Sequence, residues 1–157
     1  MRILRAFADN LFAHEILHLL SGIAMYLLIF KMFGRLELAA VAFLVSLLVD
    51  VDHYLEGFIV NHFDIRWIFS THPYIYWEKL GKVTILFHSW ELLIVIFIFG
   101  EIVNQQTLSI VIICPLFLHY VVDTFIYCGF RNMPILQYFL AYRICRHFDL
   151  KRFSPAS

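Results

Sequence analysis

The chain has 157 residues, of which 62% are hydrophobic and 15% are charged, and its mean hydropathy is +0.79. A soluble domain has about 45–50% apolar and about 25% charged residues, so the composition excludes an ordinary soluble protein and predicts an integral membrane protein. The formal net charge of zero gives no basis for nucleic-acid binding. Three cysteines without a Cys-x-x-Cys pair argue against a disulfide framework or a zinc knuckle.

Four apolar stretches predict four membrane-spanning helices, because about 20 apolar residues cross about 30 Å of hydrocarbon. They cover residues 11–33, 36–52, 84–103 and 107–128. Residues 54–82 alternate aromatic and polar side chains, and we expect interfacial amphipathic helices there. Residues 131–157 form a basic tail with another amphipathic stretch. The expected fold is an all-α integral membrane protein, a single-domain bundle of four transmembrane helices.

The basic residues predict the orientation of this bundle. Four spans place ten lysines and arginines on one side of the membrane, while only Lys31 and Arg35 fall on the other side. The side rich in basic residues is normally cytoplasmic. We therefore expect the N- and C-termini to be cytoplasmic.

Each predicted span carries histidine or carboxylate side chains near the cytoplasmic face, and the opposite halves carry almost none. Ionisable groups within a membrane are functional candidates, because placing them in lipid is costly. Chance does not readily produce this segregation. The residues are His14 and His18 in the first span, Asp50, Asp52 and His53 at the end of the second, His88 and Glu91 in the third, and His119 and Asp123 in the fourth.

The spacing within each span places paired groups on one helix face. Two pairs are four residues apart and two are three residues apart, and both separations bring side chains together on a helix. Asp52 is the exception, because its side chain points away from Asp50 unless the helix ends or unwinds near that residue. Helical bundles build metal sites from inward-facing carboxylates and imidazoles, so the sequence predicts a divalent-cation site. A hydrogen-bonded His119–Asp123 pair without metal is the alternative at that position.

A second interpretation starts from His14-Glu15-Ile16-Leu17-His18, which matches the His-Glu-x-x-His motif of zinc metalloproteases. In that motif the histidines bind zinc and the glutamate is the general base. It leaves the ionisable groups of the other three spans without a role. A third interpretation is a non-enzymatic carrier of metal or haem. The carboxylates of Asp50-Val51-Asp52-His53 count against haem, which would use axial histidines.

The order of four short motifs resembles the membrane-bound metal-dependent hydrolases, a family of inner-membrane proteins also described as LexA-binding hydrolases. The motifs are His18-Leu19-Leu20-Ser21-Gly22, Asp50-Val51-Asp52-His53, His88-Ser89 and His119-Tyr120-Val121-Val122-Asp123. The resemblance covers the chain from about His14 to Gly129 and implies a bacterial inner-membrane protein. The metal ligands that it implies are His18, Asp50, Asp52, His53, His88, His119 and Asp123.

The chain departs from the family pattern near two of these motifs. The proline that usually precedes Asp-x-Asp-His is absent, since Val49 stands there. The stretch Val83–Ser89 lacks the leading histidine, the arginine and the glycine of the family motif His-Arg-Gly-x-Thr-His-Ser. One ligand of the family is therefore missing. The candidates to replace it are His72, His14 and, by preference, Glu91, which is three residues from His88.

In its ligand pattern the family is similar to the zinc-dependent phospholipases C and related zinc nucleases, which implies metal-assisted hydrolysis of a phosphoester. One to three divalent ions, expected to be Zn²⁺, would be held by these ligands. Asp50, Asp52 or Glu91 would serve as the catalytic base. Arg131 and the arginines of the tail would bind an anionic headgroup. The implied substrate is a phospholipid or a lipid-linked phosphate in the surrounding bilayer.

Overall fold

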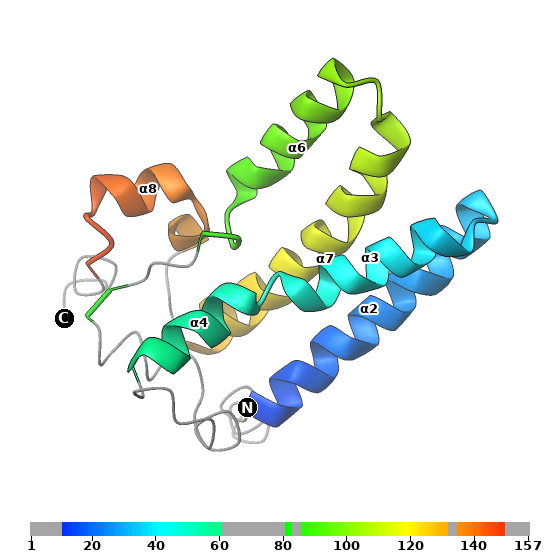
Figure 1. The fold of residues 1–157 in the computed structure, drawn as a ribbon. Helices are drawn as coiled ribbons and strands as arrows, with labels where there is room; N and C mark the ends of the chain where they lie inside the picture. Colours follow the sequence, from blue (N-terminus) through cyan, green and yellow to red (C-terminus); the bar gives the residue numbers. More distant parts are fainter. Residues whose placement is uncertain (1–10, 61–80, 83–85, 132–134, 150–157) are drawn as a thin grey trace.

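A computed structural model of the chain describes residues 11–60, 81–82, 86–131 and 135–149 (Figure 1). This part of the chain is helical and contains no strand, apart from an isolated bridge between Lys82 and Asp149. The α-helices are α2 (Leu11–Phe33), α3 (Leu36–Leu48), α4 (Val51–Val60), α6 (Trp90–Ile102), α7 (Gln106–Arg131) and α8 (Leu140–Cys145), and η2 (Ile135–Tyr138) is a 3₁₀ helix. The helix α7 packs against α2, α3 and α6, and α2 packs against α3.

Among the described residues, three helical segments are long and apolar enough to cross a membrane, by length and composition alone. They are Glu15–Phe33, Leu36–Glu56 and Gln106–Phe125. The described part of the chain therefore has the expected helical fold, and its long apolar helices are consistent with membrane association. The third predicted span, residues 84–103, is not among the three, because α6 begins at Trp90 and has 13 residues. A helix of that length extends only about 20 Å.

The connection between α2 and α3 is a tight turn. Gly34 has a φ of +65°, and its backbone N–H donates to the carbonyl of Phe30 at 2.8 Å. Glycine adopts this left-handed conformation readily, which is why helices often end at such a residue. The turn makes α2 and α3 antiparallel neighbours (Figure 1). Their interior at this end, which we call the far end, is an apolar cluster with α7: Met25, Ile29, Leu38, Ala39, Ala42 and Val111.

The second predicted span is interrupted rather than continuous. The helix α3 ends at Leu48, residues 49–50 form a turn, and α4 continues to Val60. The backbone N–H of Tyr54 donates to the carbonyl of Asp50 at 3.2 Å, so the two helices remain nearly continuous. The interruption releases Asp50 and Asp52 from the spacing of one regular helix.

The helices α6 and α7 form a close hairpin. The turn between them contains Asn104 in a left-handed conformation, which asparagine tolerates better than most residues. A Cβ atom placed on Gly100 would lie 1.7 Å from Ser109 Oγ, so no larger residue fits there without movement. Small residues at such crossings are typical of packed membrane helices.

Within the predicted basic tail the structure shows η2 and α8, separated by Phe139. The amphipathic character of this segment stays a prediction. Of the predicted interfacial region between the second and third spans, residues 61–80 lie outside the described part. The start of that region, up to Val60, continues α4.

Candidate metal centre

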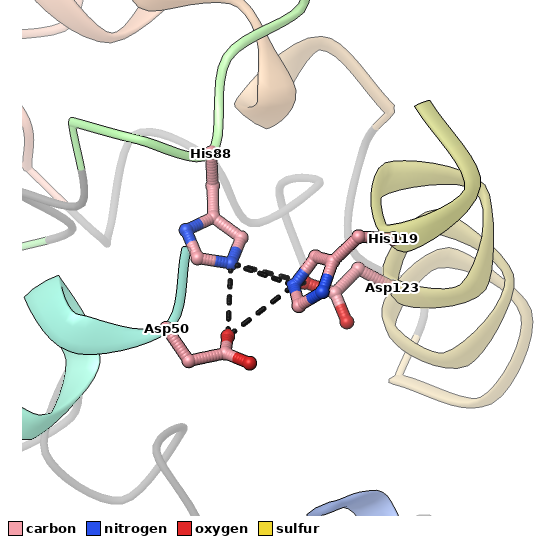
Figure 2. A group of neighbouring side chains, drawn as sticks. All are labelled: Asp50, His88, His119 and Asp123. Carbon is pink, nitrogen blue, oxygen red and sulfur yellow. Dashed lines mark hydrogen bonds and ion pairs between the residues drawn. The ribbon is translucent and has the colours of Figure 1, made fainter. Parts of the chain in front are cut away.

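Four ionisable side chains from three segments of the chain point toward one another (Figure 2). Asp50 comes from the turn between α3 and α4, His88 from the non-helical stretch before α6, and His119 and Asp123 from successive turns of α7. Each of them is at most 3% exposed. We call this group the Asp50 cluster, and it could hold a metal ion because all four ligand atoms lie within 4.8 Å of one another.

The distances within the Asp50 cluster are short and similar. Nε2 of His88 lies 3.1 Å from Oδ1 of Asp50 and 3.1 Å from Nε2 of His119. Oδ2 of Asp123 lies 3.4 Å from His88 Nε2 and 3.5 Å from His119 Nε2. The separation of Asp50 Oδ1 from His119 Nε2 is 3.3 Å. The atoms therefore surround a common point.

Hydrogen bonds alone do not account for this arrangement. An imidazole nitrogen carries at most one proton, yet His88 Nε2 faces three polar atoms at 3.1–3.4 Å. Two carboxylates buried at the same point also repel each other unless positive charge lies between them. A divalent cation would satisfy all four groups, so the residues present fit a bound metal.

A second group of possible ligands shares His88. It consists of Asp52, His53 and His88. Asp52 Oδ1 accepts a hydrogen bond from the backbone of His53 at 2.9 Å, and Oδ2 accepts one from the backbone of Phe87 at 2.9 Å. Nδ1 of His88 lies 3.3 Å from Asp52 Oδ1. Asp52 therefore faces Nδ1 of His88, whereas Nε2 of the same imidazole belongs to the Asp50 cluster.

His18, the remaining predicted ligand, and His53 also border the Asp50 cluster. The imidazole of His18 stacks on that of His119 with ring centroids 3.9 Å apart, and its Nε2 lies 3.1 Å from Asp123 Oδ1. Nε2 of His53 lies 3.9 Å from Asp50 Oδ1. All seven residues predicted as ligands therefore gather at one end of the helices, which we call the site end.

Glu91 has a different neighbour from the one expected. The backbone N–H groups of Leu140 and Ala141 donate to its two carboxylate oxygens at 2.9 and 3.0 Å. These N–H groups begin α8, and a carboxylate at a helix N-terminus is stabilised there. Glu91 also shares no helix face with His88, because Ser89 has an extended backbone and α6 starts only at Trp90. The preference for Glu91 as a replacement ligand depended on a helix face shared with His88, and that expectation was wrong.

Arg143 of α8 was not predicted individually as part of the site. Its side chain is fully buried, and Nη2 donates to the carbonyl of His88 at 3.2 Å. Burial lowers the pKa of its guanidinium, and the carboxylates of Asp52 and Glu91 oppose that shift. Arg143 thus connects α8 to the backbone of a predicted ligand. In the sequence it is one arginine among several in a basic tail, so no local signal distinguishes it.

Two further side chains lie near the site, those of Tyr120 and Glu15, and neither was among the predicted ligands. The hydroxyl of Tyr120 donates to the carbonyl of Phe87, next to His88. Glu15 accepts a hydrogen bond from the Tyr54 hydroxyl and interacts electrostatically with Asp50. The sequence placed Glu15 only in the metalloprotease motif.

Three residues considered in the sequence are not placed. His72 lies outside the described residues, and the side chains of His14 and Arg131 are outside the described part of their helices. The choice of a replacement ligand therefore stays open for His72 and His14. The metalloprotease motif likewise stays a prediction.

Comparison with known proteins finds no matching family model, no matching curated protein and no matching solved structure. The resemblance to the membrane-bound metal-dependent hydrolases therefore stays a prediction.

Proposed function

We propose that the protein is a membrane-embedded, metal-dependent hydrolase that cleaves a phosphoester carried by a lipid. The observation that carries this proposal is the Asp50 cluster, buried at one end of three helices long enough to span a membrane. Phosphoester hydrolysis at such a site agrees with the expected family. The proposal places the site at the cytoplasmic face.

The geometry of the cluster favours zinc. Ligand atoms at the corners of a tetrahedron with metal–ligand bonds of about 2.0–2.1 Å are about 3.3–3.4 Å apart. Five of the six separations between the four ligand atoms are 3.1–3.5 Å. Oxygen and imidazole nitrogen are ligands that zinc accepts.

The number of donors favours more than one ion. One tetrahedral ion would use the Asp50 cluster and leave three predicted ligands beside it: His18, Asp52 and His53. Paired ions in phosphatases and nucleases stabilise both the attacking and the leaving oxygen of a phosphoryl group. We therefore propose that the seven predicted ligands would together hold two ions.

The chain's own residues would perform the remaining tasks. A bound divalent ion would supply a Lewis acid and bring the pKa of a water toward about 7. Asp50 and Asp52 remain the proposed bases, because Glu91 is engaged with α8. Asp52 would hold the His88 ring in orientation through Nδ1, as carboxylates beside ligating histidines commonly do. Burial of these groups would exclude bulk water from the reacting atoms.

We propose four crossings of the membrane, with both termini cytoplasmic and the bacterial inner membrane as the location. The stretch 86–89 would complete the third crossing together with α6. Residues 86–88 form a bend and Ser89 is extended, so the four residues would add less than the about 13 Å of a fully extended stretch to the about 20 Å of α6. The backbone N–H of Phe87 and the carbonyl of His88 have hydrogen-bond partners within the protein, a condition that irregular backbone needs at membrane depth.

Metal analysis joined to a hydrolysis assay tests the proposal. The wild type, Asp50→Ala and His119→Ala would be purified in detergent, and zinc would be measured per protein. A soluble aryl phosphodiester and a phospholipid in mixed micelles would serve as substrates. We expect bound zinc and hydrolysis in the wild type and loss of both in the variants. Equal metal content in all three proteins would overturn the proposed site.

A second candidate function is a non-enzymatic metal-holding membrane protein. The observation that favours it is that the Asp50 cluster alone offers four protein ligands, and a zinc site with four protein ligands is usually structural. Full metal content without hydrolysis of either substrate would support this candidate against the hydrolase. An absorption spectrum without a Soret band would exclude haem. Glu15→Gln should abolish the activity of a metalloprotease and spare a phosphoesterase that uses the other carboxylates.

A further inference from the structure

An apolar groove runs between α2 and α7. It has a volume of about 490 Å³ and is lined only by apolar side chains: Ala24, Met25 and Leu28 of α2, and Ile113, Phe117 and Leu118 among those of α7. Both walls belong to helices that are long and apolar enough to cross a membrane. The groove therefore opens toward hydrocarbon, and the acyl chains of lipids are the molecules that meet it there.

One end of this groove lies near the Asp50 cluster. Leu118 directly precedes His119, and Ala24 is six residues from His18, which corresponds to about 9 Å along a helix. The stacked imidazoles of His18 and His119 close the seam between the two helices at that end. A chain lying in the groove would thus have its polar end directed toward the Asp50 cluster.

We propose that the groove between α2 and α7 binds one acyl chain of the substrate and brings the attached phosphoester to the Asp50 cluster. This inference rests on the proposed function and narrows its substrate to phosphoesters that carry a long acyl chain. Acyl chains in a bilayer already avoid water, so the groove would contribute orientation and close packing rather than hydrophobic transfer. Orientation of a reacting group is itself a large part of catalysis.

A second groove provides a matched control. It lies between α6 and α7, has a volume of about 380 Å³, and is lined by Val95, Phe99 and Leu108 together with the polar side chains of Gln105 and Ser109. Its position is at the far end, since Ser109 is ten residues from His119, or about 15 Å along α7. An effect that arises only from contact between lipid and exposed apolar side chains should be the same for both grooves.

The test compares two substitutions that fill one groove each. Ala24→Phe fills the groove between α2 and α7, and Val95→Phe fills the groove between α6 and α7. Both residues are exposed to the surrounding lipid, so neither change disturbs a buried core. The full-length protein, loaded with zinc, would be assayed on a long-chain phospholipid in mixed micelles and on a soluble short-chain phosphodiester.

We expect Ala24→Phe to lower kcat/KM for the long-chain phospholipid by about tenfold or more, because occupied pockets discriminate substrates by such factors. Hydrolysis of the short-chain substrate should be unchanged, and Val95→Phe should behave as wild type with both substrates. Equal loss in the two variants, or no loss in Ala24→Phe, would overturn the inference while leaving the hydrolase intact.

A binding measurement keeps the inference testable if no hydrolysis is found. A phospholipid with a photoreactive group in its acyl chain would be cross-linked to the zinc-loaded protein in nanodiscs, and the labelled peptides identified by mass spectrometry. Labelling concentrated at residues 24–28 and 113–118, and lost in Ala24→Phe, supports the groove even where the hydrolase proposal fails. Labelling spread evenly over both grooves would overturn it.

Discussion

The same three helices enclose two interiors of opposite character. At the far end, the space between α2, α3 and α7 is filled by apolar side chains such as Ile29, Ala39 and Val111, all fully buried. At the site end, two to three turns along the same helices, the space is filled by His18, Asp50 and the α7 ligands. Packing stabilises the first interior without any further component. The second contains buried charge, which is stable only when compensated.

The two ends of these helices therefore have different roles. The apolar end fixes the helices relative to one another. At the site end, the distances between candidate ligand atoms then differ by no more than about half an ångström. Substitutions at the two ends should therefore have separable effects, one on stability and the other on metal binding.

The largest expected effect comes from His119→Ala, compared with Val111→Ala. Both residues are fully buried on α7, eight positions apart. Loss of a ligand should weaken zinc binding by more than about 100-fold, since even residues behind the ligands account for 10–100-fold. Val111→Ala should lower the free energy of unfolding by about 2 kcal/mol and leave zinc affinity unchanged. Competition with a chromogenic chelator measures the affinity, and the same affinity in both variants would remove the distinction between the two ends.

A smaller loss of affinity is expected for Asp52→Asn. The amide retains an acceptor but not the negative charge that faces Nδ1 of His88. We expect zinc affinity to fall by about 10–100-fold, as for other residues that orient a ligating histidine. Ser46→Ala on α3 is the control, because its buried hydroxyl bonds only the carbonyl of Ala42 in its own helix. An unchanged affinity in Asp52→Asn would remove Asp52 from the site.

At the far end, Gly100→Ala should affect stability alone. The added methyl group would meet Ser109 at 1.7 Å and force α6 away from α7. Overpacking of this kind costs about 1–3 kcal/mol. Thermal unfolding in detergent measures the loss, and Ser109→Gly in the same chain should restore part of it. Zinc content should stay at the wild-type level, and a parallel loss of zinc would mean that the two ends are coupled.

The smallest effect is expected for Glu91→Gln. The glutamine can still accept hydrogen bonds from the start of α8 but loses the charge, so the free energy of unfolding should fall by about 1 kcal/mol or less. Hydrogen exchange at the backbone of Leu140 and Ala141 should become faster. Zinc content should not change. A fall in zinc content would instead support the original expectation that Glu91 is a ligand.

Much of the site could be predicted because the membrane makes polar residues conspicuous. In an apolar chain, ionisable groups near one end of each span have few positions to occupy other than a shared interior. The same reasoning required the helix to end near Asp50, and α3 does end just before it. The apolar periodicity also placed α2 and most of α7 correctly, since long apolar runs between turn residues leave few alternatives.

What the sequence did not predict depends on contacts between distant segments. Nothing local indicates that residues 86–89 are non-helical, because they lie in a mostly apolar stretch that continues into α6. Glu91 and Arg143 acquire their partners only through the docking of α8, about 50 residues further along the chain. Hydropathy reports burial in lipid or protein alike, and so it gives no information on which polar group meets which.

The irregular peptide around Phe87 has a consequence for how the protein is made. Its polar backbone groups are satisfied by three different elements: the N–H of Phe87 by Asp52, the carbonyl of Phe87 by Tyr120, and the carbonyl of His88 by Arg143. Two of these partners are synthesised after the peptide itself, and α8 comes last. The Asp50 cluster can therefore reach its final arrangement only after α8 has been synthesised and has docked onto the carbonyl of His88.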